Sequence, residues 1–203
     1  MKNIFGIILI AIMWLMVACN PKQASKHIKL EGKMAELEKE AQNGDMEALY
    51  YLGVEYYNGA KEHPSWSKEA IRCLERAAAE GKIGGAYYHL SICYQLGKGC
   101  ERNYDKAIVM ACKGADLDMI ESKYEAAKLL ILYGDVHDPI TAHKAFSYAK
   151  EAAAEYYPDA WELLGQMYLE GIGTAKDAKE GSRWLERAYR INDDQELDSI
   201  PII

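Results

Sequence analysis

Residues 86–99 read AYYHLSICYQLGKG, and the same pattern recurs three more times along the chain. The related segments are ALYYLGVEYYNG at 48–59, SKYEAAKLLILYGD at 122–135 and AWELLGQMYLEGIG at 160–173. Their first residues are 38, 36 and 38 positions apart. A fixed period in this range indicates a repeat architecture, in which each unit buries its apolar face against its neighbours. The sequence therefore predicts a stack of four related units.

Each copy contains two helical patterns. Leu90 and Tyr94 are four positions apart, so they share one face of a helix. A second pattern follows in each copy, with small residues at equivalent positions that allow close helix packing: Ala70, Ala107, Ala145 and Gly181. Glycine-containing segments between the two patterns are typical of a helix end followed by a turn. A lone helix of the second kind, KMAELEKEAQNG at 33–44, precedes the first copy. We therefore predict an all-α fold of about nine helices.

The motif Leu-small-x-x-Tyr followed by G-x-G, with this period, resembles the Sel1-like repeat, a relative of the tetratricopeptide repeat. The resemblance implies a right-handed α-solenoid whose first helices line a concave surface. It covers residues 33–191, as an N-terminal half-repeat and four repeats at about 46–81, 84–118, 120–156 and 158–191, and it leaves residues 192–203 as a C-terminal tail. The third copy departs most, because it lacks the Leu, the Tyr and the second Gly.

The N-terminus, MKNIFGIILIAIMWLMVAC, has one lysine followed by an uncharged apolar run from Ile4 to Ala18. At a rise of about 1.5 Å per residue this run is short for the ~30 Å hydrocarbon core of a bilayer. A charged start, a short apolar middle and a small residue before the cut are typical of a secretory signal. The final LMVAC resembles the bacterial lipobox, which implies cleavage after Ala18 and acylation of Cys19. The alternatives are an ordinary signal peptide, or an anchor helix with a chance cysteine.

The same resemblance sets an expected cellular location. We expect residues 1–18 to be removed and residues 19–32, which are polar at their start, to form a lipidated tether to a membrane. In the bacterial sorting rules, an Asp after the acylated Cys retains a lipoprotein in the inner membrane. Asn20 stands at that position. We therefore expect a protein of the cell envelope, on the outer membrane facing the periplasm rather than on the inner membrane.

The charge balance of the chain bears on its partners. Without residues 1–18 the 24 basic residues become 23, against 31 acidic ones, which gives a net charge of −8. No basic tract is visible in the sequence. Nucleic-acid binding depends on lysine and arginine contacts to phosphates. The sequence therefore argues against a nucleic-acid partner.

Three short motifs are candidates for chemistry. LGKG at 96–99 lacks the Ser or Thr and the preceding strand of a phosphate loop. SWSK at 65–68 and SYAK at 147–150 match the S-x-x-K pair of penicillin-recognising enzymes, but no S-D-N or K-T-G follows. The histidines form no i, i+4 pair: His27, His63, His89, His137 and His143. We predict no catalytic residue, no metal site and no cofactor.

Four cysteines besides Cys19 lie in the first two copies: Cys73, Cys93, Cys100 and Cys112. An exported protein can form disulfides, and four cysteines allow two bridges or four thiols. A cysteine-rich branch of the Sel1-like family, with members linked to penicillin binding, ties each repeat with one bridge. The third and fourth copies here contain no cysteine, so we expect thiols and leave two bridges as the alternative.

Tyrosine is abundant, with 15 residues, and many of them fall in the first helices. By analogy with tetratricopeptide geometry, the positions beside the Leu–Tyr stripe face the concave groove. The candidate contact residues are Tyr50, Tyr51, Tyr57, Tyr88, His89, Ile92, Gln95, Tyr124, Lys128, Glu162 and Gln166. The same register adds Val54, Glu125, Ile131, Leu163 and Leu169 to the groove. Tyrosine suits protein recognition, because it brings contact area and a polar tip. The alternative is that these rings fill gaps between repeats.

Three functional hypotheses follow from these observations. The first is a non-catalytic envelope lipoprotein that holds a protein or peptide partner in its concave groove. The second is a penicillin-binding or hydrolase-like protein resembling the cysteine-rich branch. The third is a structural envelope spacer, for which the groove would be featureless.

Overall fold

The computed structural model describes residues 21–192, and the side chains of residues 32–190. Within this part the chain forms nine helices and no strand. Their bounds are α2 (Pro21–Gln42), α3 (Met46–Gly59), α4 (Trp66–Ala78), α5 (Gly84–Leu96), α6 (Tyr104–Ala115), α7 (Ile120–Tyr133), α8 (Pro139–Ala154), α9 (Pro158–Glu170) and α10 (Ala178–Asn192). The predicted all-α fold is confirmed. The expected signal peptide, Cys19 and residues 193–203 of the expected tail lie outside the described residues.

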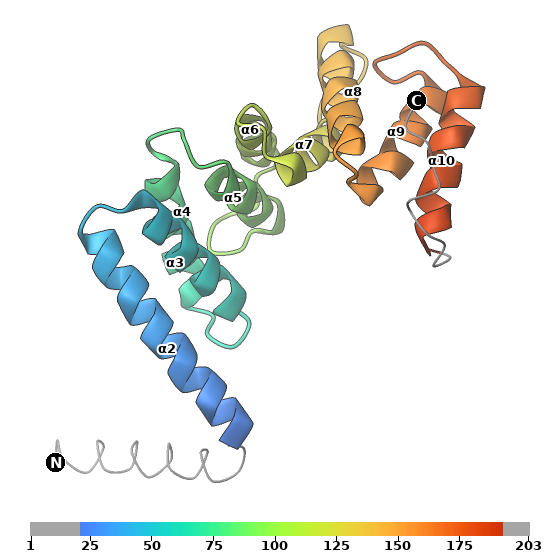
Figure 1. Ribbon diagram of the computed structural model, residues 1–203. Helices are drawn as coiled ribbons and strands as arrows, with labels where there is room; N and C mark the ends of the chain where they lie inside the picture. The colour runs from blue at the N-terminus through green and yellow to red at the C-terminus, as the bar shows by residue number, and fades with distance from the viewer. Residues whose placement is uncertain (1–20, 193–203) are drawn as a thin grey trace, which may run out of the picture.

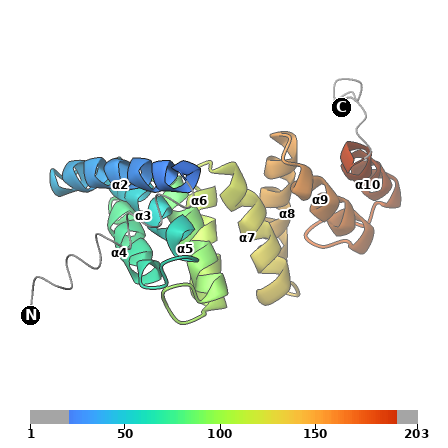
Figure 2. The ribbon, with the colours of Figure 1, turned by 90° about the horizontal axis from the view of Figure 1, so that it is seen from below.

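The helices pack as consecutive pairs into a curved, elongated array (Figure 1). Figure 2 shows the same array from below, with successive pairs following one another from blue to red. The first helices of neighbouring pairs, α3, α5, α7 and α9, contact one another more extensively than the second helices do. The first helices therefore line the inner side of the curve, as expected for a solenoid of stacked helix pairs.

Helix α2 precedes the first full helix pair in the chain and packs against α3. It begins at Pro21, earlier than the helix expected from Lys33. Proline at the first helical position and a following run rich in Lys, Ala, Gln and Glu account for this, because these residues favour a helix start and helix propagation. The carboxylate of Asp45 then caps α3 by accepting from the backbone N–H groups of Glu47 and Ala48, at 2.9 and 3.0 Å.

The core follows the predicted stripe. Leu52, Leu90 and Leu164 are buried, and the small residues of the second helices, such as Ala107 and Ala145, are completely buried. Small residues at these positions bring helix axes close enough for the large residues of the facing helix to fill the space. Close packing of this kind joins each pair to the next and produces two hydrophobic clusters along the array.

Tyrosines of the stripe also reach back to the preceding helix. The hydroxyl of Tyr56 donates to Glu38 on α2, and that of Tyr94 donates to Glu75 on α4, both at 2.9 Å. Burial, followed by the hydrogen bond to the glutamate, raises the pKa of each of these tyrosines to about 12. The stripe therefore joins adjacent pairs through polar as well as apolar contacts.

The second glycine of each G-x-G turn lies against the preceding repeat. Gly99 has φ +81°, and a Cβ built there would lie 2.1 Å from the carbonyl oxygen of Ser67 on α4. Gly173 has φ +67°, and a Cβ there would lie 2.1 Å from the carbonyl oxygen of Ala142 on α8. Both positions require glycine because of conformation and because of space.

Candidate functional site on the concave face

Four tyrosine rings and one histidine ring lie close together on α3 and α5. The histidine-centred cluster consists of Tyr50, Tyr51, Tyr57, Tyr88 and His89. The ring centroid of His89 lies 5.8 Å from Tyr50, 5.7 Å from Tyr57 and 5.3 Å from Tyr88, all edge-on, and Tyr51 lies 5.0 Å from Tyr50. Edge-to-face pairs at these distances are favourable for aromatic rings. The structure therefore brings together five of the predicted contact residues, from two repeats.

The backbone of α5 allows this cluster to form. A Cβ at Gly85 would lie 2.6 Å from the hydroxyl oxygen of Tyr50, so glycine lets that ring rest directly on the helix. The Nδ1 of His89 is 2.9 Å from the carbonyl oxygen of Gly85 and donates to it, because a carbonyl can only accept. Burial lowers the pKa of His89 below its usual value. At neutral pH the imidazole is therefore uncharged, with Nε2 as an acceptor.

A polar group continues the concave face from α5 to α7. Glu125, although acidic, is buried. Its carboxylate accepts from the side-chain amide of Gln95 at 2.7 Å and pairs with the Lys128 ammonium at 2.6 Å. That ammonium also lies 5.2 Å from the ring centroid of Tyr124. The carboxylate thus joins two neighbouring repeats. The ion pair and the hydrogen bond offset the free-energy cost of burying its charge.

Tyr88 lies where the histidine-centred cluster meets this polar group. Burial first, and then the neighbouring Tyr157 and Glu125, raise the pKa of Tyr88 to about 12. The carboxylate of Glu121 acts in the same direction. The phenol is therefore neutral at physiological pH and keeps its O–H as a donor.

The remaining predicted contact residues are spread along the array. Ile92 is half-buried on α5. Glu162 and Gln166 are exposed on α9, where the Gln166 amide donates to the Glu162 carboxylate at 3.4 Å. These residues form the fourth-repeat end of the concave face, beyond the ring pair of Tyr124 and Tyr157, whose centroids are 5.1 Å apart.

Sequence reasoning missed two members of this face. Lys98, interpreted only as part of a turn, donates from Nζ to the carbonyl oxygen of Tyr57 at 2.7 Å and lies 3.5 Å from the centroid of that ring. Tyr157 precedes the helix-starting Pro158 and lies outside the register used to assign the groove. Nothing in the local sequence of Lys98 shows its partner, since the two residues are 41 positions apart.

The sequence motifs considered for catalysis do not form Ser–Lys pairs. Ser65 and Lys68 are both exposed. The hydroxyl of Ser147 donates to the carboxylate of Glu151 at 2.9 Å, and Lys150 is exposed. Each serine thus has an ordinary helix-surface environment.

The cysteines are free thiols in the structure: Cys73 and Cys93 are buried, and Cys100 and Cys112 are half-buried. Burial, and then the neighbouring Cys100, raise the pKa of Cys93 to about 12. A thiol with so high a pKa is a poor nucleophile at neutral pH, because the thiolate is the reactive form.

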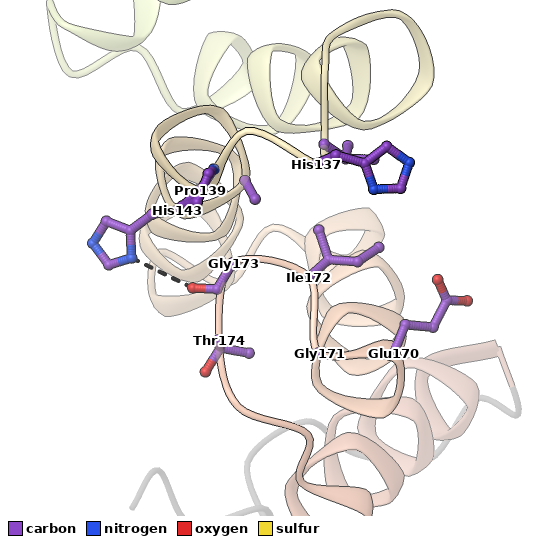
Figure 3. A pocket seen from close by; sticks show the side chains of 10 residues that line it. His137, Pro139, His143, Glu170, Gly171, Ile172, Gly173 and Thr174 are labelled. Carbon is purple, nitrogen blue, oxygen red and sulfur yellow. Dashed lines mark hydrogen bonds between the residues drawn. The ribbon is translucent and has the colours of Figure 1, made fainter.

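His137 and His143 border an open hollow of about 860 Å³ between the turn before α8 and the turn after α9 (Figure 3). Nδ1 of His143 lies 3.4 Å from the carbonyl oxygen of Gly173. Glu170, the last residue of α9, also lines the hollow (Figure 3). No group of three or more metal-ligating side chains occurs in the part of the chain that the structure describes.

Among residues 21–192, none of the helices is both long and apolar enough to span a membrane.

A curved stack of helix pairs with an aromatic inner face defines an α-solenoid of the kind that presents a concave surface. The model of the Sel1 repeat matches residues 47–82, 85–119, 120–157 and 159–193. The chain belongs to the Sel1 repeat family. Proteins with these repeats generally mediate protein–protein interactions and typically act as non-enzymatic scaffolds.

Individual relatives are similar over different shares of the chain. Chitin synthase regulatory factor 2 of Schizosaccharomyces pombe is 29% identical over 130 residues, which are 63% of this chain and 25% of that protein. A protective antigen of uropathogenic Escherichia coli with an SLR fold has a TM-score of 0.65 at 21% identity, over 78% of this chain and 33% of the other. A Sel1 repeat protein from Oxalobacter formigenes gives 0.62 at 18% identity, over 79% and 62%. This chain thus spans about a quarter of the yeast protein and a third of the antigen. The two solved structures support the solenoid fold.

Proposed function

We propose that this protein is a lipid-anchored scaffold of the bacterial cell envelope that holds a protein or peptide on its concave face. The observation that carries the proposal is the histidine-centred cluster, in which three tyrosines from two repeats converge on one uncharged imidazole and a fourth packs against one of them. Large rings with polar tips are the side chains that dominate protein interfaces. A surface of this kind on a rigid stack of helices is preformed, which lowers the entropy cost of binding.

The binding role is tested by placing a photo-reactive phenylalanine analogue at Tyr88 on α5, or at Val109 on α6, in the producing cell. Val109 is also solvent-accessible, with 48% of its surface exposed, but it lies on a second helix. We expect one recurrent cross-linked polypeptide from position 88 and none from position 109. The same pattern from both positions would exclude the concave face as the specific surface.

Substitution of Tyr88 separates binding from packing. Tyr88→Ala should weaken binding of the cross-linked partner by about tenfold or more, as for a central interface ring, while the helical circular dichroism stays unchanged. Tyr88→Phe retains the ring and should keep most of the affinity. Loss of helicity in the alanine variant would instead assign Tyr88 to the core.

The membrane anchor is supported by the sequence LMVAC at 15–19. A fatty-acid label supplied to cells should be incorporated into the full chain and lost in Cys19→Ala. Persistent labelling of the alanine variant would contradict the lipoprotein assignment.

The outer-membrane location is supported by Asn20 alone. In a cell with two membranes, we expect Asn20→Asp to move the protein from the outer to the inner membrane fraction. An unchanged distribution on a sucrose gradient would contradict this part of the proposal.

A further inference from the structure

The tyrosines of the concave face lie among carboxylates on the first turns of two helices. Glu121 is in the first turn of α7 and Asp159 in the first turn of α9. Neither of them has an ion-pair partner within the described residues, whereas Glu125 is paired with Lys128. The concave face between α3 and α9 therefore carries two carboxylates with which no cationic side chain of the described residues forms an ion pair.

Packing of three helices places the start of α7, which carries Glu121, against the start of α5. Tyr50 of α3 rests on Gly85, and a Cβ at Gly84 would lie 3.1 Å from the Cβ of Met119, which precedes α7. The start of α5 is therefore in contact with α3 on one side and with the start of α7 on the other. After burial as the main cause, the Glu121 carboxylate contributes to the raised pKa of Tyr50 and Tyr88.

Glu121 also acts on Tyr157, the residue immediately before α9. Burial, and then Asp159, raise the pKa of Tyr157, and Glu121 adds to the same shift. One half-buried carboxylate thus lies within electrostatic range of rings from three repeats.

The face already accommodates cations from its own chain. The ammonium of Lys98 lies 3.5 Å from the centroid of Tyr57, and that of Lys128 lies 5.2 Å from the centroid of Tyr124 while paired with a carboxylate. These are cation–π distances. The three tyrosines whose pKa Glu121 helps to raise, namely Tyr50, Tyr88 and Tyr157, have no such cation among the described residues.

We propose that the partner presents a basic peptide segment, whose Lys or Arg side chains lie over Tyr88 and Tyr157 and pair with Glu121 and Asp159. This inference rests on the proposed function, because it names the chemistry of the partner held on that face. It follows from charge complementarity: aromatic faces and unpaired carboxylates both attract a cation, and both repel or fail to bind an anionic segment. The net charge of −7 of the whole chain attracts such a partner over longer distances.

Fluorescence anisotropy with two matched peptides tests the inference on the intact protein. The probes are a fluorescein-labelled peptide of alternating Ser and Arg and its counterpart of alternating Ser and Glu. We expect saturable binding of the first, weakened by salt, and none of the second. Equal affinity for the two peptides, or no saturable binding of the Arg peptide, overturns the inference.

A matched pair of double variants locates the binding. Glu121→Gln with Asp159→Asn should weaken the Arg peptide by about tenfold, since both removed charges face it. Glu155→Gln with Asp105→Asn removes the same charge from exposed positions associated with the second helices α8 and α6, and should leave the affinity within about twofold. Equal losses in the two variants would mean attraction by net charge only and would also overturn the inference.

Failure of this inference is distinguishable from failure of the proposed function. If position 88 cross-links a partner through an acidic or uncharged segment, the scaffold function stands and the basic-segment inference fails. If position 88 gives no specific cross-link, the scaffold function fails whatever the peptides do.

Discussion

The second and third repeats solve the same packing problem differently at the turn between their two helices. In the second repeat, residues 97–103 bring Gly99 against the backbone of α4, with Ser67 too close for any side chain. The third repeat has a shorter turn, residues 134–138, without a second glycine. There Tyr133 stacks on Tyr104, with centroids 3.7 Å apart and planes at 11°. A turn can therefore be fixed to the preceding repeat by backbone on backbone or by ring on ring.

The largest effect is expected at the glycine turns. Gly99→Ala and Gly173→Ala each combine a left-handed φ with a collision against a backbone carbonyl, and should cost about 3 kcal/mol or more of unfolding free energy in urea titrations. Gly44→Ala is the matched control. Gly44 has φ +92°, but a Cβ there meets nothing within 4 Å, so only the conformational cost of about 1 kcal/mol applies. Equal losses at positions 44 and 99 would refute the packing role of the second glycine.

The ring-on-ring contact of the third repeat should be worth less. Tyr133→Ala is expected to lower the unfolding free energy by about 1 kcal/mol, because a stacked aromatic pair contributes that order beyond simple burial. A double-mutant cycle with Tyr104→Ala measures the pair itself. Leu132→Ala, at a neighbouring residue that is 61% exposed, is the control and should change little. A coupling energy of zero would mean that the short turn holds its place without the stack.

The two turns also differ in how much of their structure could be predicted from the sequence. The 36- to 38-residue period, the Leu stripe and the glycine turns predicted the helices and their stacking, because these depend on local spacing. The stack between Tyr104 and Tyr133 was not predicted, since the third repeat simply appeared degenerate. A contact between residues of adjacent repeats depends on how the repeats are rotated against each other, which the period does not specify.

The candidate site also combines features that the sequence predicts with contacts that it does not predict. Tetratricopeptide register placed Tyr88 and His89 side by side on one helix, and the structure joins them to three further rings. The hydrogen bond between Gln95 and Glu125, and the contact of Lys98 with Tyr57, join residues that are about 30 to 40 positions apart in the sequence. Sequence spacing therefore identified the face but not the polar contacts that distinguish one part of it from another.

Two buried serines extend the comparison to single hydroxyl groups. Ser91 and Ser122 are both fully buried, but the Ser91 hydroxyl donates to the carbonyl of Tyr88 at 2.8 Å, while the Ser122 hydroxyl has no hydrogen-bond partner in the described part of the chain. The other three repeats have alanine at the position of Ser122: Ala48, Ala86 and Ala160. Removing an unsatisfied buried hydroxyl relieves its desolvation cost, whereas removing a bonded one loses the bond.

Ser122→Ala should therefore stabilise the protein by up to about 1 kcal/mol, and Ser91→Ala should be neutral or destabilising by about 0.5 kcal/mol. Differential scanning fluorimetry of the two variants side by side measures the contrast. A lower melting temperature of Ser122→Ala would mean that the Ser122 hydroxyl has a hydrogen-bond partner in solution. The two buried serines would then not differ in hydrogen bonding.

The smallest expected effect concerns the groove position where the second repeat has His89 and the third has Glu125. Burial is the main influence on His89 and lowers its pKa, although the hydrogen bond to Gly85 and the charge of Glu121 act against it. The unfolded chain therefore binds a proton more readily than the folded one. By linkage, the His89 contribution to the unfolding free energy falls as pH drops from above the unfolded pKa of about 6.5 towards the lower folded value.

His89→Gln should accordingly reduce the loss of stability between pH 7.5 and pH 5.5, measured by urea titration at each pH. His143→Gln removes an exposed imidazole on α8 and is the matched control. Glu125 keeps its charge compensated by Lys128 and Gln95, so the third repeat meets the same burial problem by pairing, whereas the second meets it by staying neutral. If the two histidine variants showed the same dependence of unfolding free energy on pH, the neutral state of His89 would not contribute to stability. The second and third repeats would then differ at this position only in the shape of the side chain.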